Sequence, residues 1–223
     1  LRHNYTQTFA LTLAETTAKE DHDALERLME YLEDRGVLNR ALETLPETGE
    51  MKVRAERGQP LTRPELAVLL AWSKITLFDD IVASDIPDDP YFEDLLVNYF
   101  PSPINTYSKA MSNHRLKREI IATIIANRVL DMAGPVALLR LREVTGGDNA
   151  QVARGLEAAR AVLNFDGFQR EVDQLDTIVP ADVQIDLRLH AASAMVDAAL
   201  WFIETHPDLH VGDAVQHTEA PLN

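Results

Sequence analysis

Apolar residues recur along most of this chain at three- and four-residue steps, the spacing of one face of an α-helix. No stretch alternates apolar and polar residues for long enough to predict a strand. Ala and Leu dominate the apolar residues and only 6% of the chain is aromatic, which also favours helices. The fold class is predicted to be all-α, a multi-helix, bundle-like domain with short loops. The predicted helices cover residues 4–35, 62–83, 91–99, 104–133, 135–144, 148–163, 165–175 and 180–204.

Residues that start or stop helices punctuate this pattern. Thr62 and Glu65 have the spacing of a capping box, in which the side chains satisfy backbone N–H groups at a helix start. Asp148 and Gln151 repeat that spacing after Gly146-Gly147. Gly134-Pro135 is predicted to end one helix and open the next, because glycine suits the end of a helix and proline its first turn.

The chain is predicted to form one helical domain over residues 1–205, followed by a frayed, flexible tail over 206–223. The segment 43–60 contains two prolines, two glycines and many charges, so it is predicted to be a solvated connector with at most a short helix. It is the one internal boundary that the pattern suggests. Because the chain begins at Leu1 inside a helical pattern, we expect it to be part of a longer protein.

Composition narrows the classes of function. The chain has no cysteine, which excludes disulfides, thiolate catalysis and cysteine metal sites and fits a reducing cytoplasm. Its net charge of −15 disfavours binding to nucleic acid or to an anionic membrane. The richest apolar stretch, Ile120 to Leu130, is interrupted by Asn127 and Arg128 and is shorter than the about 20 residues that a membrane helix needs, so no membrane span is predicted.

Histidines and glycines suggest only weak candidate sites. His206 and His210 lie four residues apart around Asp208, but a zinc site uses three or four protein ligands, so we expect a polar tail and no metal site. His190 falls on the apolar face of the last helix and is interpreted as a core histidine. Gly146-Gly147 before a helix could admit an anion, but without a strand or a lysine it is interpreted as a helix-breaking turn.

Charge is segregated in the middle of the chain. Seven acidic residues and no lysine or arginine lie between Ile75 and Ser108, and a basic cluster follows. Within this cluster Arg115 and Arg118 are three residues apart and can share a helix face. They are candidates to contact an anion or an acidic partner surface. The alternative is that they pair with the acidic stretch of the same chain.

Several motifs then make the chain similar to a known family. In sequence order, from about Leu1 to Phe202, they resemble segments of the large bacterial NAD-specific glutamate dehydrogenases. Phe168-Gln169 departs from that pattern, since the family tends to have a tryptophan there, and the tail after Thr205 does not align. The motifs are Asn4-Tyr5 with Gln7, Leu61-Thr62-Arg63-Pro64-Glu65-Leu66-Ala67-Val68-Leu69-Leu70, Tyr99-Phe100-Pro101, the run from His114 to Thr123, and Leu175-Asp176 followed by Pro180-Ala181.

The resemblance implies a very long parent enzyme whose catalytic region lies upstream, with this chain as its C-terminal helical domain. The parent would oxidise L-glutamate with NAD to 2-oxoglutarate and ammonium, in the cytoplasm and as a homo-oligomer. That chemistry needs a dinucleotide-binding βαβ unit and a lysine in a glutamate pocket. Neither is found in this sequence, so no catalytic, NAD-binding or metal-binding residue is predicted within the chain.

Three functions remain open at this point. The domain could support the structure or assembly of the enzyme by packing on the catalytic region or on a neighbouring subunit. It could instead be a regulatory module that binds an amino acid or another small anion between helices, with Arg115 and Arg118 as anchors. The third alternative is an unrelated helical scaffold protein.

Overall fold

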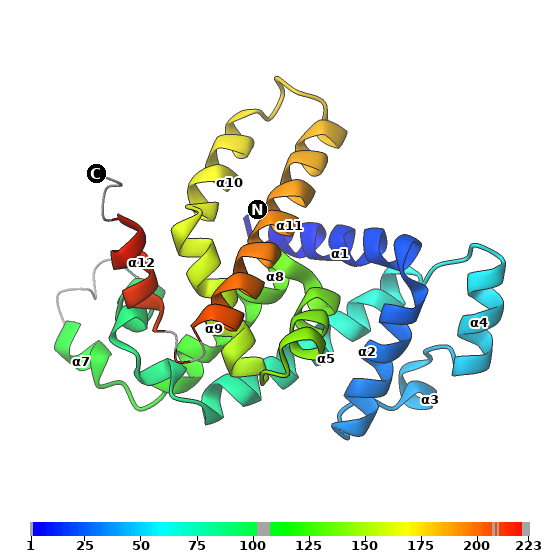
Figure 1. Cartoon of the computed structure of the whole chain (residues 1–223), viewed down its shortest axis with the longest axis horizontal. Helices are drawn as coiled ribbons and strands as arrows, with labels where there is room; N and C mark the ends of the chain where they lie inside the picture. The colour runs from blue at the N-terminus through cyan, green and yellow to red at the C-terminus, as the bar shows by residue number, and fades with distance from the viewer. Residues whose placement is uncertain (1, 102–107, 207, 209, 220–223) are drawn as a thin grey trace. The chain divides into compact units, whose positions relative to one another are not determined.

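The computed structural model of this chain confirms the all-α fold class. It describes residues 2–101, 108–206, 208 and 210–219, and every regular element within these residues is a helix (Figure 1). The α-helices are α1 (Arg2–Glu20), α2 (His22–Asp34), α3 (Arg40–Glu43), α4 (Thr48–Glu56), α5 (Arg63–Ala83), α6 (Glu93–Tyr99), α7 (Ser108–Ser112), α8 (Lys117–Thr145), α9 (Asn149–Val162), α10 (Phe165–Gln174), α11 (Ala181–Thr205) and α12 (Val211–Glu219). Two 3₁₀ turns, η1 (Ile86–Asp88) and η2 (Pro90–Phe92), join α5 to α6.

Two of the predicted helices are each divided in the structure. The predicted helix over 4–35 is interrupted at Asp21, whose carboxylate accepts a 2.9 Å hydrogen bond from the Ala24 N–H and so starts α2. The predicted helix over 104–133 is broken between α7 and α8, and its residues 104–107 lie outside the described residues. The break follows from His114, whose Nδ1 accepts a hydrogen bond from the Leu116 N–H and stabilises a turn instead of the helix.

Two other boundaries concern Gly134 and the end of the chain. Gly134 has φ 78°, a left-handed conformation that interrupts α8, as the Gly134-Pro135 pair predicts.

The predicted tail contains helix α12, which the polar composition of this segment did not indicate. Val211 and Ala214 of α12 are buried, so this part of the tail is packed. Residues 220–223 lie outside the described residues.

The chain divides into two compact units. One consists of Leu1–Thr76 with Leu130–Arg140, and the other of Leu77–Val129 with Leu141–Asn223. The divisions fall within α5 and α8, and the segment 43–60 lies inside the first unit. Each unit is described by itself below.

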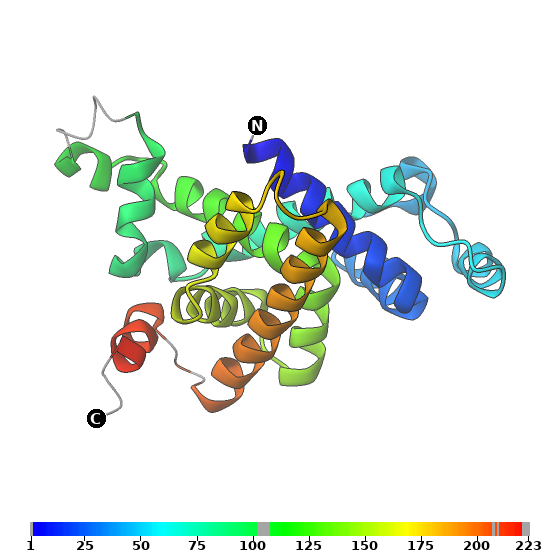
Figure 2. The ribbon, with the colours of Figure 1, turned by 90° about the horizontal axis from the view of Figure 1, so that it is seen from above.

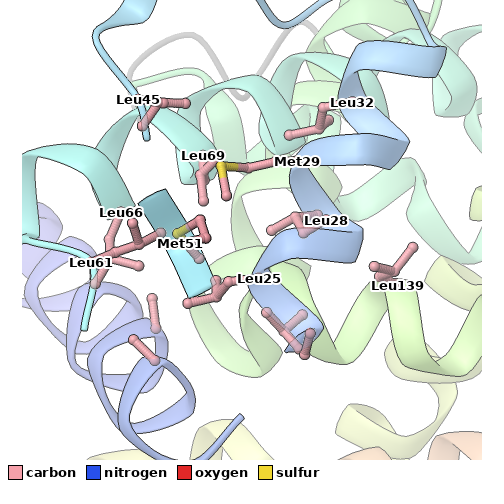
Figure 3. Packing of buried hydrophobic residues seen from close by; sticks show 14 of the residues in the cluster. Leu25, Leu28, Met29, Leu32, Leu45, Met51, Leu61, Leu66, Leu69 and Leu139 are labelled. Carbon is pink, nitrogen blue, oxygen red and sulfur yellow. The ribbon is translucent and has the colours of Figure 1, made fainter. Parts of the chain in front are cut away.

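The core of the first unit is an aliphatic cluster around α2 (Figure 3). Leu25, Leu28 and Leu32 of α2 lie on one face, as their three- and four-residue spacing predicts, and they pack with Leu66 and Leu69 of α5. All five side chains are at most 2% exposed. The cluster is completed mainly by Ala14, Ala18, Ala24, Met29, Leu38, Leu45, Met51, Leu61, Val136 and Leu139.

The segment 43–60 contains the short helix α4, as predicted, but it is not wholly solvated. Leu45 and Met51 insert into the core of the first unit. Arg40, which is 4% exposed, donates hydrogen bonds to Glu26 at 2.8 Å and to Glu33 at 3.0 Å. Arg40 precedes this segment, and the cost of burying its charge is offset because it is paired with two carboxylates of α2.

The start of α5 is held by Glu65. Its carboxylate accepts hydrogen bonds from the Thr62 N–H at 2.6 Å and from the Thr62 hydroxyl at 2.8 Å, and it also pairs with Arg54. Burial opposes ionisation of Glu65, but the bonds from Thr62 and Arg54 outweigh it and lower the pKa of this carboxyl. The Glu65 half of the predicted capping box is therefore present.

The second unit is built around α9, which is buried along most of its length. Helices α10, α11 and α12 each contact it, and α10 and α11 run side by side, joined at one end (Figures 1 and 2). Gly155 of α9 faces α11, where a Cβ would lie 2.6 Å from the Ile203 side chain and 3.1 Å from the Ala199 carbonyl oxygen. A glycine is required there because the two helices approach so closely.

Helix α8 is long and apolar enough to cross a membrane, judged by length and composition alone. Of its most apolar window, 67% is buried inside the protein. Arg128 near the middle of this helix is bound to a buried carboxylate, as described below. These features fit the core helix of a folded domain.

Gly155→Val should destabilise the chain by about 1–3 kcal/mol, because the added carbon atoms overlap Ile203 and the α11 backbone. The matched control is Gly49→Val in α4, where a Cβ meets nothing within 4 Å, and its effect should stay within about 0.5 kcal/mol. Urea unfolding followed by circular dichroism measures both. Equal effects of the two substitutions would show that the helices can separate at Gly155 without cost.

Candidate functional site

Arg118, one of the two arginines predicted as a contact pair, is engaged within the second unit. Its Nη2 donates hydrogen bonds to the carbonyl oxygens of Val82 at 2.8 Å and Ser84 at 2.5 Å. Its Nη1 forms an ion pair with Asp88 of η1. The guanidinium thus satisfies the carbonyls at the end of α5 and fixes the turn that follows.

Arg115 lies apart from this arrangement. Because α8 begins at Lys117, Arg115 precedes the helix, and the two arginines do not share a helix face. Its side chain is exposed and forms no ion pair with any residue that the structure describes. The pair does not form a two-pronged anion clamp, since Arg118 already binds two carbonyls and a carboxylate.

A buried charge cluster lies where the sequence pattern did not indicate one. Glu157 of α9 is fully buried and accepts hydrogen bonds from Arg128 Nε of α8 at 2.8 Å and from Arg160 Nε at 3.1 Å. Arg160 also donates to Asp166 of α10 at 2.6 Å. We call these four residues the Glu157 cluster. The one available signal was Arg128, a charge inside the richest apolar stretch.

The Glu157 cluster has the electrostatics of a structural centre. Burial opposes the charge of Arg160, but the charges of Glu157 and Asp166 outweigh it and raise the pKa of Arg160. Tyr91 lies near the Glu157 cluster, and burial raises the pKa of its phenol group. Both oxygens of the Glu157 carboxylate accept hydrogen bonds from guanidinium groups, so neither is available to a substrate.

A hollow of about 370 Å³ lies in the second unit at the start of α9. Arg154 forms an ion pair with Asp85 there, and burial lowers the pKa of this arginine. The surplus of carboxylates makes the hollow negative, which disfavours a carboxylate or phosphate ligand. The lining residues are Ser84, Asp85, Asp148, Ala150, Gln151, Arg154, Asp208 and His210.

The predicted turn and capping box before α9 are confirmed. Gly146 has φ 69° and ends α8. The Asp148 carboxylate accepts a hydrogen bond from the Gln151 N–H at 2.8 Å, and the Gln151 side chain accepts one from the Asp148 N–H at 3.0 Å. The positive end of α9 is thus occupied by a carboxylate of the chain itself, which leaves no anion site at that position.

The histidines take separate places in the structure. Among the described residues, no three His, Asp or Glu side chains are arranged to hold a metal ion. The Thr205 hydroxyl donates to the Trp201 carbonyl and accepts a 2.7 Å hydrogen bond from His206 Nδ1, and His210 lies 3.9 Å from an oxygen of Asp89. His190 was interpreted as a core histidine, but this interpretation is wrong: its side chain is exposed, and its Nδ1 donates to the Asp186 carbonyl at 2.7 Å.

Glu157→Gln should destabilise the chain by about 3–5 kcal/mol, because it removes a fully buried negative charge, leaves the half-buried Arg128 without a counter-charge and leaves Arg160 with Asp166 alone. Glu50→Gln is the matched control: Glu50 pairs with Arg54 at 2.7 Å on the surface, where an ion pair contributes at most about 1 kcal/mol. Thermal or urea unfolding of the two variants gives the comparison. A loss for Glu157→Gln no larger than for the control would contradict a central role of this carboxylate.

The chain matches proteins of known sequence over nearly its whole length. A sequence profile described as "Glutamate dehydrogenase, C-terminal" matches residues 58–223. The NAD-specific glutamate dehydrogenase of Halomonas elongata is 35% identical over 218 residues, covering 97% of this chain and 14% of that protein. That of Pseudomonas aeruginosa is 40% identical over 206 residues, covering 92% of this chain and 13% of that protein.

A third relative shares a lower sequence identity with this chain. The NAD-specific glutamate dehydrogenase of Mycobacterium tuberculosis is 31% identical over 189 residues, covering 84% of this chain and 12% of that protein. These matches confirm the resemblance carried by the sequence motifs. The chain spans 12–14% of the length of these relatives, so most of each relative lies outside the region compared.

Proposed function

Because this chain belongs to the family of glutamate dehydrogenase C-terminal domains, we propose that it is a non-catalytic helical domain of an NAD-dependent glutamate dehydrogenase. The parent reaction would convert L-glutamate, NAD⁺ and water to 2-oxoglutarate, ammonium, NADH and a proton. The observation that carries the proposal is the match of almost the whole chain to 14% of a much longer enzyme. Its role in that enzyme is structural: it supports the catalytic region from outside the active site.

We place NAD binding and catalysis in the part of the parent outside this chain. A dinucleotide-binding unit is built on parallel strands, and the residues described here form helices and turns. The buried charges found in them serve packing, as the Glu157 cluster and the pairs of Arg40 illustrate. Lys74, a residue of the chemical type that the parent reaction needs, is bound to Asp131 at 2.6 Å.

Arg115 is the member of the predicted pair that we propose for a contact with the parent. It is exposed, whereas Arg118 is already bound to the end of α5. A single exposed guanidinium beside a turn can bind a carboxylate on another surface without disturbing its own domain. We propose further that the parent is cytoplasmic, which the absence of cysteine in this chain fits, and that it assembles as a homo-oligomer.

Deleting this domain from the full-length parent should lower the initial rate of glutamate-dependent NADH formation by about 10²-fold or more, because a small misplacement of catalytic groups has an effect of that size. Absorbance of NADH gives the rate. Circular dichroism and oligomeric mass of the truncated protein serve as controls for its folding. A truncated protein that stays folded and keeps the full rate would rule out the supporting role.

Arg115→Glu in the full-length parent should weaken its assembly by at least about tenfold in dissociation constant, because the substitution reverses the charge at a polar contact. Arg57→Glu, a charge reversal at another exposed arginine, is the matched control and should leave assembly unchanged. Sedimentation velocity over a concentration series measures both variants. Identical assembly of the two would remove Arg115 from the contact.

A further inference from the structure

Helix α11 has two apolar faces, and only one of them is used inside the second unit. The face toward α9 and α10 buries Ala192, Met195, Ala199 and Phe202, together with Gln184 and Arg188. An α-helix advances 100° per residue, so residues 18 apart fall on one line after five turns. Val183 and Trp201 are 18 residues apart and lie on the opposite side of α11.

This second face is apolar and exposed over most of the helix. Between Val183 and Trp201 it also carries Leu187, His190 and Ala194. Val183 is 43% exposed, Leu187 38% and Trp201 54%. The row is about 27 Å long at a rise of 1.5 Å per residue. We call these five residues the outer face of α11.

Single exposed apolar residues are ordinary, but an aligned row that includes a tryptophan is not. Tryptophan is enriched among the residues that contribute most to protein–protein binding. Ile178, in the turn just before α11, is 74% exposed and adds to the apolar surface of the same helical pair. The outer face therefore has the composition of an interface with another protein surface.

The outer face is bordered by negative charge along one side. Asp186, Asp197 and Glu204 lie along one side of the apolar row, Asp182 precedes them, and all four side chains are exposed. No ion pair joins any of them to a residue that the structure describes. The one arginine of α11, Arg188, is buried and paired with Asp173 at 2.7 Å, and the helix contains no lysine. A complementary partner surface is apolar with basic residues along one edge.

We propose that the outer face of α11 is the surface through which this domain packs on the remaining part of its parent chain. This inference rests on the proposed function, because it takes the parent to be the longer enzyme. The remaining part of the parent would offer a large surface, because the relatives carry most of their length outside the region that matches this chain. The contact can form within one subunit or with a neighbouring subunit.

A second copy of this domain is a poorer occupant of the same surface. In a two-fold symmetric contact the same patch meets itself, so an antiparallel pairing of the two α11 helices would bring the acidic edges of both copies close together. The chain also carries a net charge of −15, which adds repulsion between copies. A basic-edged surface of the parent chain avoids both costs.

The test is site-specific photo-crosslinking in the purified full-length parent. The photoreactive residue p-benzoylphenylalanine replaces Leu187 in one variant and Trp201 in another, and mass spectrometry identifies the crosslinked peptides. Val144, which is 65% exposed on α8, provides the matched control position. We expect peptides from outside residues 1–223 at both α11 positions, with a yield at least about tenfold above that at Val144.

Three outcomes would overturn the proposal. They are no crosslink at either α11 position, crosslinks to peptides within residues 1–223, and equal yields at the α11 positions and at Val144. The deletion experiment separates this inference from the proposed function. A crosslink outside 1–223 with an unchanged rate after deletion supports this surface and overturns the supporting role, whereas a lost rate without a crosslink overturns only this surface.

Discussion

The second unit depends on one buried carboxylate. Glu157 is removed from water on a helix that is itself surrounded, and it is stable there because Arg128 and Arg160 donate to it. Arg128 belongs to α8, and Arg160 continues to Asp166 on α10, so a single charge connects three helices. A buried ion pair contributes little net stability compared with apolar packing, but removing one partner is costly. The cluster therefore specifies how these helices align more than it stabilises them.

That alignment has a consequence for α11. With α9 fixed by the cluster, Gly155 lets α11 approach closely, and Arg188 binds Asp173 of α10. The face of α11 toward α9 is then fully used. Its other apolar side is left exposed, with acidic residues along one edge. The buried charges of this unit are thus used for packing, while an apolar helix face stays exposed.

The hollow beside α9 and the arginines near α8 fit the same interpretation. The hollow is negative, and the start of α9 is capped by Asp148, so neither attracts the small anions that a regulatory site for amino acids would bind. Arg118 is used to hold the end of α5. The exposed surface that is available for contacts outside the domain includes Arg115 and the outer face of α11.

The sequence by itself determined the all-α class, the core face of α2, the break at Gly134 and the cap of α9, because local patterns and backbone preferences produce these features. It also identified the family, through motifs spread along the chain. Only the tertiary structure decided which apolar faces are buried. The pattern placed His190 on an apolar face, but periodicity cannot say whether a neighbour covers that face. The same holds for Glu157, whose partner Arg128 is 29 residues away and meets it only when α8 and α9 pack.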